Sequence, residues 1–336
     1  MPQDEVVEYL RCYAHDNRLP VRYRARVRLV EPQDGEPRFR IETSQGTIEA
    51  NSVVVATGLY QQPRVPSYAT ELPTDVLQLT SGHYRNLGTL PAGGVLVAGG
   101  GQSGCQIGEE LYQTGRWVYL SIGKAPRAPR RYRGRDIYEW VELTGFVNRT
   151  AEMLPSPQAR FASNPTSSGK DGGHTLNLHR FARDGVTLLG HIRGAAGGRI
   201  VLSPDLAGSL AFADAAEANM IKMIDDYIAA QGLEAPEEVL DQLRDGYEQA
   251  AIEELDVRAE GITSVIWALG CRFDFGMVRA AVFDEAGYPI QHRGATLQPG
   301  LYFVGLPYLV NQKSGFLAGV GDDVRGIAAE IAAAGA

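Results

Sequence analysis

Three glycines of the segment VLVAGGGQSG have the spacing of a loop that binds phosphate groups through its backbone. Gly99, Gly101 and Gly104 form the spacing G-x-G-x-x-G, in which the first glycine allows a tight turn and the second lets a pyrophosphate approach. The third lets the following helix pack closely on the strand, and the unpaired N–H groups at that helix start bind phosphate. Gln102 and Ser103 lie within the same loop. These residues predict a dinucleotide-binding site.

The elements around this loop have the order that such a site requires. Val95–Ala98 is an apolar run typical of a buried parallel strand, and Trp117–Ile122 is a second run of this kind. The helix predicted over Cys105–Gln113 joins them, which gives one strand–helix–strand unit. A glycine-rich turn without a ligand is the alternative interpretation, and this context favours the nucleotide site over it.

A basic segment follows the second of these strands. A site for NAD would carry an Asp or Glu about 20 residues beyond the loop, where it binds the ribose hydroxyls. This chain has a small uncharged residue and then cations, which suit the 2′-phosphate of NADP(H); a solvated basic loop is the alternative. The candidate residues are Ser121, Lys124, Arg127, Arg130 and Arg131.

Composition narrows the class of protein. The chain has 336 residues, of which 44% are hydrophobic and 21% charged, as in a globular enzyme of two domains. Its net charge of −8 argues against a nucleic-acid partner. The 3 cysteines are far apart and form no CxxC pair, which predicts a reduced, cytoplasmic setting. No apolar run approaches the length of a membrane span, so we expect no membrane association.

Further elements follow from periodicity and turn residues. Alternating or continuous apolar runs predict strands over Arg26–Glu31, Arg38–Thr43, Thr47–Ala50, Ser52–Thr57, Thr263–Leu269 and Leu301–Gly305. Helices are predicted over Asp4–Asn17, Asp214–Ala230 and Pro236–Leu255, and from near Gly319 to the end. Residues 151–173 are rich in Pro, Ser and Gly, which predicts an active-site lid or a disordered connector without favouring either.

Two histidines and a cysteine are weaker candidates for chemistry. His174 and His179 are five residues apart, a spacing that does not stack on one helix face, so ordinary polar roles are favoured over metal binding. No metal site is therefore predicted. Cys105 follows Gly104 in the first turn of a helix, which lowers the pKa of an exposed thiol, but buried packing is the favoured interpretation.

Several motifs in one order resemble a known superfamily. SVVVATGLYQQPRVP (Ser52–Pro66) resembles the ATG-x-x-x-x-P linker between the FAD and NADPH domains of flavin-containing monooxygenases. The loop at Gly99–Gly104 is similar to their NADPH-binding motif, and RRYRGRD, VIWALGCRFDF, PGLYFVGLP and SGFLAGVGDD follow in order. The chain thus resembles the class B flavin-containing monooxygenase superfamily, above all the bacterial flavoproteins often labelled as involved in potassium transport. Nothing in the sequence is typical of a transporter.

The resemblance implies an α/β fold with two Rossmann-like (FAD/NAD(P)-binding) three-layer domains. The FAD domain would be split in sequence and N-terminally incomplete, with the NADP domain inserted into it. Residues 1–89 and 261–336 would form the two halves of the FAD domain. Residues 90–260 would form the NADP(H)-binding domain with a lid-like loop and a helical insertion. The implied flavin-site residues are Thr57, Gly58, Gly305, Gly319 and Asp322.

The sequence departs from the family pattern at its beginning. The family opens with its own G-x-G-x-x-G, which holds the FAD pyrophosphate, and this chain has no such motif before Ser52. We therefore expect the first strand–helix–strand unit to be missing, through natural loss, a misplaced start or truncation. Without that unit, the chain should lose most of its affinity for the FAD pyrophosphate. NADP(H) is accordingly the firmer cofactor prediction, and FAD the weaker one.

A second departure concerns oxygen chemistry. The class B fingerprint is F-x-G-x-x-x-H-x-x-x-(F/Y), and counting back from Tyr84 places Thr80 at the histidine. Val76 and Thr74 stand at the glycine and phenylalanine, and His83 is out of register. The resemblance therefore implies descent from a monooxygenase. Because Thr80 replaces the histidine, a reaction without oxygen transfer is also possible for this chain.

Three functions follow from these observations. The first is an NADPH-dependent flavoprotein oxidoreductase, monooxygenase-like, in which NADPH reduces FAD and oxygen is transferred to a small organic substrate. The second is a flavin-dependent NADPH reductase without oxygen transfer. The third is an FAD-less NADP(H)-binding remnant that acts as a sensor or partner module. Catalytic residues, the substrate and any homo-oligomer are not identified by the sequence.

Overall fold

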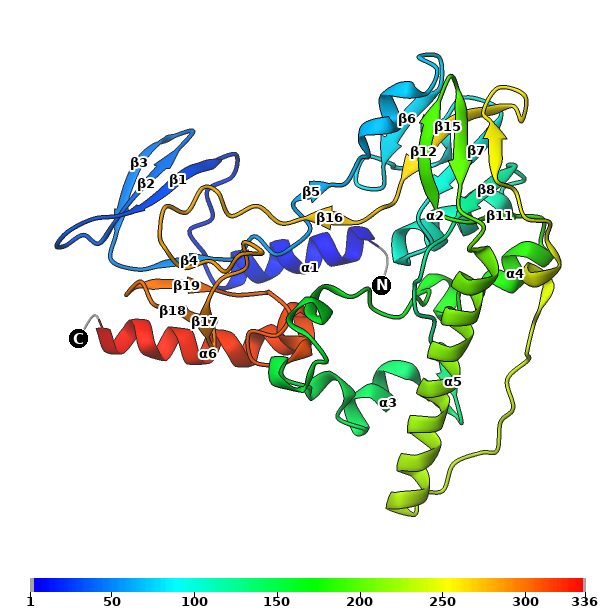
Figure 1. Ribbon diagram of the computed structural model, residues 1–336. Helices are drawn as coiled ribbons and strands as arrows, with labels where there is room; N and C mark the ends of the chain where they lie inside the picture. The colour runs from blue at the N-terminus through cyan, green and yellow to red at the C-terminus, as the bar shows by residue number, and fades with distance from the viewer. Residues whose placement is uncertain (1–2, 335–336) are drawn as a thin grey trace. The chain divides into compact units, whose positions relative to one another are not determined.

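The computed structural model describes residues 3–334 and divides into two compact units (Figure 1). The first unit comprises Met1–Leu59, Asn148–Arg160 and Phe273–Ala336, and the second comprises Tyr60–Val147 and Phe161–Arg272. These boundaries differ from the predicted ones at residues 89/90 and 260/261. The reason is strand pairing, because residues 60–89 and 261–272 each contribute a strand to the sheet of the second unit.

A five-stranded parallel sheet forms the centre of the second unit, in the order β11-β8-β7-β15-β6. Its strands are β6 (Leu77–Thr80), β7 (Gly94–Ala98), β8 (Val118–Ser121), β11 (Thr187–Leu189) and β15 (Ile262–Trp267). Every residue of β7 is buried, because β7 lies inside the sheet and is covered on both faces. The predicted strands at 95–98, 117–122 and 263–269 are thereby confirmed.

Different elements cover the two faces of this sheet. On one face lie α2 (Gln102–Gln113) and α4 (Leu178–Arg183), whose apolar residues join one core cluster with Val95 and Val97. On the other lies an antiparallel sheet of β12 (Ile192–Ala196), β13 (Arg199–Leu202) and β14 (Glu254–Asp256), which packs against Leu96 and Val265. The second unit therefore has three layers, as a Rossmann-like domain is expected to have.

Further elements of the second unit pack beside these layers. The helices are α3 (Ile137–Leu143) and α5 (Leu206–Gln231), which share a core cluster around Trp140 and Ile224. Two short antiparallel pairs are formed by β9 (Arg131–Tyr132) with β10 (Arg135–Asp136), and by β5 (Gln62–Pro63) with β16 (Cys271–Arg272). The helix predicted over 214–230 is confirmed and begins eight residues earlier, at Leu206.

The helix predicted over Pro236–Leu255 is wrong. The segment contains a short 3-10 turn, Asp245–Glu248, and the strand β14, and is otherwise irregular. Its polar groups bond to distant partners instead: Arg133 donates from Nε to the carbonyl of Pro236 at 2.9 Å. Gln249 bonds through its side chain to the backbone of Leu188 and Val186, at 2.7 and 2.8 Å. Tertiary contacts here override local helix propensity.

Within residues 3–334, the first unit contains two sheets and two α-helices. The antiparallel meander is β1 (Val27–Pro32), β2 (Phe39–Thr43) and β3 (Gly46–Ala50); the second sheet has the order β17 (Gln291–His292), β18 (Ala295–Thr296), β19 (Leu301–Phe303) and β4 (Val53–Val55). The helices are α1 (Gln3–Asp16) and α6 (Leu317–Ala334). Phe39, Tyr288 and Phe303 are fully enclosed in the core between the two sheets. All the elements predicted for this unit are confirmed.

Two apolar segments of the first unit are partly exposed. In the run Ser52–Thr57, Val54 is 42% exposed because β4 is covered on one face only. The apolar stripe of α1 lies at the surface, where Leu10 is 50% exposed. In the described part of the chain, no helix is both long and apolar enough to span a membrane.

The segment 151–173 is divided between the two units. Its first part, through Arg160, belongs to the first unit, and its second part belongs to the second unit. Thr166, Ser167 and Ser168 are buried, so a disordered connector is the wrong description for these residues. A lid function remains a prediction.

Candidate functional site

The three motif glycines have different surroundings. Gly99 has a φ of +119°, and a Cβ added there would overlap the carbonyl of Ala268; a Cβ on Gly104 would overlap the carbonyl of Gly99. The fold itself therefore requires these two glycines. Gly101 is different, because a Cβ added to it would have nothing within 4 Å. Free space at the second glycine is what the close approach of a pyrophosphate requires.

The start of α2 supplies donors beside that space. Gly101 is the N-cap residue and has no side chain to cap the helix. Gln102 and Ser103 are exposed in the first turn, where N–H groups have no partner within the helix. Such a helix start favours an anion through both its N–H groups and its dipole. The arrangement can hold a dinucleotide phosphate.

A segment from the predicted lid is fastened to this loop. Gln102 Nε2 donates to the carbonyl of Ser167 at 2.6 Å, and the N–H of Ser167 donates to Gln102 Oε1 at 3.1 Å. The next residue, Ser168, accepts at its carbonyl from Arg130 Nη1 at 3.1 Å. Residues 166–168 therefore lie against the glycine loop, a contact that the sequence did not reveal.

The predicted role of Arg127 in binding a 2′-phosphate does not fit its position. Its side chain is 6% exposed, and its Nη2 donates to Asp214 and Glu217, both at 2.7 Å. Burial would lower the pKa of the guanidinium, but the hydrogen bonds and charges of Glu217 and Asp214 raise it above its ordinary value. Arg127 is an internal cation that joins the 121–135 segment to α5.

The other residues predicted to bind a 2′-phosphate differ in their exposure and in their bonding partners. Arg130 is ion-paired with Asp136 at 2.8 Å, and Arg131 donates to the carbonyl of Gly173 at 2.7 Å. The hydroxyl of Ser121 is buried and donates to Gly190 at 2.9 Å. Lys124 is exposed just beyond β8. Among the four cations predicted to bind the 2′-phosphate, Lys124 differs from the three arginines. It is exposed, and its side chain forms no hydrogen bond or ion pair within residues 3–334.

A buried pair of side chains was missed by the sequence analysis. Glu109 is 4% exposed on the inner face of α2, and its Oε1 lies 2.6 Å from Nε2 of His174. The sequence contained one signal for this pair, because Glu109 lies on the same helix face as the buried Cys105. A carboxylate is rarely buried unless it has a partner. The prediction that His174 is an ordinary polar residue did not anticipate this pairing.

His179 belongs to a second buried network. The N–H of Gly246 donates to its Nδ1 at 3.1 Å, so the proton of the ring lies on Nε2, which donates to Asp214 at 3.2 Å. Tyr247 donates to the same carboxylate at 2.6 Å. Burial would raise the pKa of Asp214, but the hydrogen bonds from Tyr247 and Arg127 hold it below its ordinary value. Burial, with Asp214, raises the pKa of Tyr247 to about 12.

Cys105 is buried, as predicted. Its side chain is 1% exposed, and the thiol donates to the carbonyl of Gly100 at 3.2 Å. Burial, with a smaller contribution from Glu109, raises the pKa of the thiol to about 12. A thiol of this kind stays protonated at neutral pH and supports the loop rather than reacting.

The flavin-site residues implied by the resemblance lie in the first unit. Thr57 and Gly58 follow β4, and Gly305 follows β19, the parallel neighbour of β4. Ligands bind at the carboxyl ends of such parallel strands. Gly58 and Gly305 have φ of +65° and +72°, and a Cβ on either would meet nothing within 4 Å. The three residues are thus brought to one edge with room for a ligand.

Two further implied residues have structural explanations. A Cβ on Gly319 would overlap the carbonyl of Lys313, so this glycine lets α6 pack against the turn before it. Asp322 is exposed and ion-paired with Arg325 on the same helix. Neither contact requires a flavin.

The position of the missing fingerprint histidine lies at the end of β6. Thr80 Oγ1 is 2.8 Å from Nδ1 of His83, the histidine that is out of register. The two side chains that stand at and near the fingerprint position are therefore bonded to one another, which occupies the Thr80 hydroxyl.

Comparison with known proteins shows which families this chain resembles. Residues 1–142 match the family model described as pyridine nucleotide-disulphide oxidoreductase. An uncharacterised CzcO-like oxidoreductase of Geobacillus kaustophilus is 28% identical over 327 residues, which cover 96% of this chain and 76% of the relative. Among solved structures, the flavin-containing monooxygenase from Stenotrophomonas maltophilia has a TM-score of 0.61 at 17% identity, covering 99% of this chain and 77% of that one. In sequence the chain is similar to oxidoreductases, and in fold it is similar to flavin-containing monooxygenases.

A second solved structure has a similar fold. The ornithine N-hydroxylase of Kutzneria sp. 744, determined with reduced FAD, NADP+ and L-ornithine, has a TM-score of 0.58 at 17% identity, over 99% of this chain and 77% of that one. The predicted α/β fold with FAD/NAD(P)-binding domains, and the predicted likeness to flavin-containing monooxygenases, are therefore confirmed. The fold of this chain spans most of the fold of those enzymes.

Proposed function

We propose that this chain is a flavin oxidoreductase that is NADPH-dependent and monooxygenase-like and acts on a small organic substrate. Its cofactors would supply hydride transfer and oxygen activation, and the chain would supply binding, orientation and exclusion of water. The single observation that carries the proposal is the free space at Gly101, beside the uncapped start of α2. The other two motif glycines are explained by packing alone, and Gly101 is not.

Each unit would bind one of the two cofactors. In the second unit, the backbone from Gly101 to Ser103 would hold the pyrophosphate, and Lys124 would pair with the 2′-phosphate. In the first unit, Gly58 and Gly305 would let a flavin approach the backbone at the carboxyl ends of β4 and β19. The family likeness supports flavin and nicotinamide cofactors, while the preference for NADPH rests on Lys124.

The test compares two glycine-to-valine variants of the full chain. Gly101→Val puts a side chain into the proposed phosphate space, whereas Gly208→Val, on exposed α5, also has nothing within 4 Å of its Cβ. NADP+ binding is measured by calorimetry, and anaerobic bleaching of added flavin by NADPH is measured by absorbance. We expect Gly101→Val to lose both signals and Gly208→Val to keep them, with both variants folded. Wild-type affinity in Gly101→Val would refute the proposal.

A reductase without oxygen transfer is the second candidate, favoured by the bond between Thr80 and His83. No imidazole stands at the fingerprint position, and the threonine hydroxyl there already has a partner. The two candidates differ in the fate of oxygen when NADPH is consumed with amines, thioethers or ketones present. A monooxygenase yields an oxygenated product, whereas a reductase yields hydrogen peroxide or reduces another acceptor. Product analysis by mass spectrometry decides between them.

A further inference from the structure

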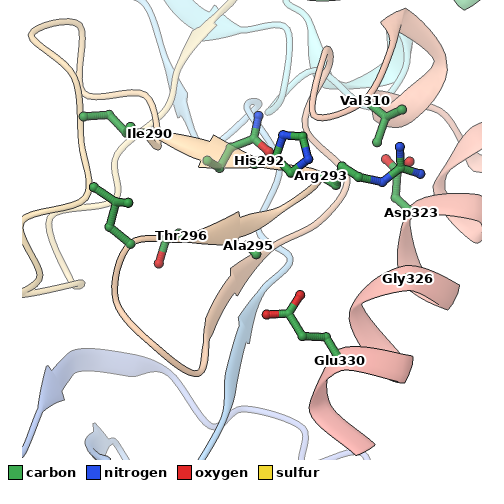
Figure 2. A pocket seen from close by; sticks show the side chains of 11 residues that line it. Ile290, His292, Arg293, Ala295, Thr296, Val310, Asp323, Gly326 and Glu330 are labelled. Carbon is green, nitrogen blue, oxygen red and sulfur yellow. The ribbon is translucent and has the colours of Figure 1, made fainter. Parts of the chain in front are cut away.

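A pocket of about 490 Å³ lies within the first unit, between the β17–β18 hairpin and α6 (Figure 2). Ile290 and Leu297 line it from the hairpin side, and Val310 lines it from the chain before α6. Its volume is within the range of small-molecule sites, which combine apolar walls with a few convergent polar groups. The polar groups of this pocket indicate which ligand it fits.

Asp323 is a buried carboxylate that lines the pocket with one oxygen unbonded. The residue is 6% exposed, and its Oδ2 has no hydrogen-bond partner among the described residues. Burial raises the pKa of Asp323, although a hydrogen bond with Ser314 and the charge of Arg293 act in the opposite direction. Buried polar atoms in folded proteins nearly always have a partner, so a carboxyl group with a vacant acceptor at a pocket wall favours a ligand that carries a donor.

Charges of both signs are placed around this oxygen. Glu330 follows Asp323 by seven residues on α6 and faces the hairpin, while Arg293 extends from the hairpin toward Asp323 (Figure 2). Glu330 also accepts from the hydroxyl of Tyr302 at 3.3 Å, which orients its carboxylate. Between the two acids stands Gly326, where a Cβ would meet nothing within 4 Å. The helix face is therefore acidic and open, and the opposing hairpin is cationic.

We propose that this pocket binds a small amphipathic zwitterion, an α-amino acid with an apolar side chain. Its ammonium group would lie between the carboxylates of Asp323 and Glu330, its carboxylate would face Arg293, and its side chain would lie along Ile290 and Leu297. A simple cation would leave Arg293 beside a like charge, and a simple anion would face two carboxylates. The adjacent opposite charges of an amino acid match both sides. This inference goes beyond the proposed function, since neither the glycine loop nor Gly58 and Gly305 line the pocket.

Calorimetric titration with three matched probes tests the charge requirement. L-Phenylalanine carries both charges, phenethylamine lacks the carboxylate, and 3-phenylpropionate lacks the ammonium group. We expect L-phenylalanine to bind in the millimolar range or tighter, and each single-charge probe to bind at least about tenfold more weakly. Equal affinity of either single-charge probe, or no binding of L-phenylalanine, overturns the proposal. The titration uses no NADPH or flavin, so its failure is separate from failure of the proposed function.

Two variants of α6 locate the binding. Gly326→Leu puts a leucine side chain into the pocket at a position where the Cβ meets nothing within 4 Å, whereas Ala329→Leu puts the same side chain on an exposed position that does not line the pocket. We expect Gly326→Leu to weaken L-phenylalanine at least about tenfold and Ala329→Leu to leave it unchanged. Asp323→Asn should also weaken it, through loss of the charged acceptor. Unchanged affinity in a folded Gly326→Leu variant shows that the ligand lies elsewhere.

Discussion

The side-chain amide of Gln102 is hydrogen bonded twice to the backbone of Ser167, at 2.6 Å through Nε2 and 3.1 Å through Oε1. Gln102 opens α2 directly after the open glycine, Gly101, and Ser167 is buried in the segment predicted as a lid or connector. Gln102 therefore belongs to the proposed phosphate site and also holds residues 166–168 against it. Changes at Gln102 should affect both.

Gln102→Ala tests this coupling. Loss of two hydrogen bonds worth about 1 kcal/mol each should increase local opening around Ser167 roughly tenfold or more. We expect faster amide exchange at residues 166–168 and weaker NADP(H) binding. Gln106→Ala, an exposed glutamine one turn later on α2, is the matched control. Exchange that is equally slow in both variants would mean that the two bonds do not hold the segment.

Two alanine substitutions on α2 should have opposite effects on stability. Gly104→Ala forces a Cβ into the carbonyl of Gly99, which should lower the free energy of unfolding by about 1–3 kcal/mol or more. Gly108→Ala places its Cβ 3.9 Å from the ring of Phe181, an ordinary contact, and should raise it by about 0.5–1 kcal/mol. Urea unfolding measures both. A stable Gly104→Ala variant would contradict the close packing of α2 on β7.

Lys124 and Arg127 should differ in what they contribute. Lys124→Ala removes the exposed cation beyond β8 and should weaken NADPH about tenfold with little effect on NADH. Arg127→Met removes the internal partner of Asp214 and Glu217, which should cost about 3–5 kcal/mol of stability without changing the preference between the two nucleotides. Fluorescence titration and urea unfolding separate the effects. A selective loss of NADPH in Arg127→Met would restore the original prediction for that residue.

Asp214 should make stability sensitive to acid. Its folded pKa lies below the ordinary value of 3.8, so the folded state holds fewer protons and the charged carboxylate stabilises the fold above that pH. This stabilisation is lost as pH falls through 3.8 toward the folded pKa. Asp214→Asn should therefore be less stable at pH 7 and show a flatter pH dependence in acid, measured by urea unfolding. An unchanged acid slope would show that other carboxylates account for it.

The conformation of the glycine loop could be predicted from the sequence because its determinants are local. The turn at Gly99, the open position at Gly101 and the packing at Gly104 are each set by backbone conformation over a few residues. The flanking strands were also predictable, since β7 and β15 are continuous apolar runs buried on both faces. Patterns of this kind identify an element without knowledge of its partners.

The side-chain partners could not be predicted in the same way. Arg127 lies in a basic segment typical of a phosphate site, but Asp214 and Glu217 on a helix some ninety residues later bury it. The pairing of Glu109 with His174 likewise depends on a contact 65 residues apart in sequence. Such contacts follow from the tertiary fold, and one sequence contains no periodicity that reveals them.

The irregular segment 236–253 has a consequence for how the protein folds. Its sequence favours a helix, whereas the native chain holds it through distant groups such as Arg133 and the backbone of Leu188. Those groups exist as partners only after the sheet of the second unit has assembled. We expect this segment to acquire native protection last during refolding, after passing through transient helix, and pulse-labelled amide exchange would detect that order. A segment with a local preference for helix would then have to lose that helix to reach its native conformation.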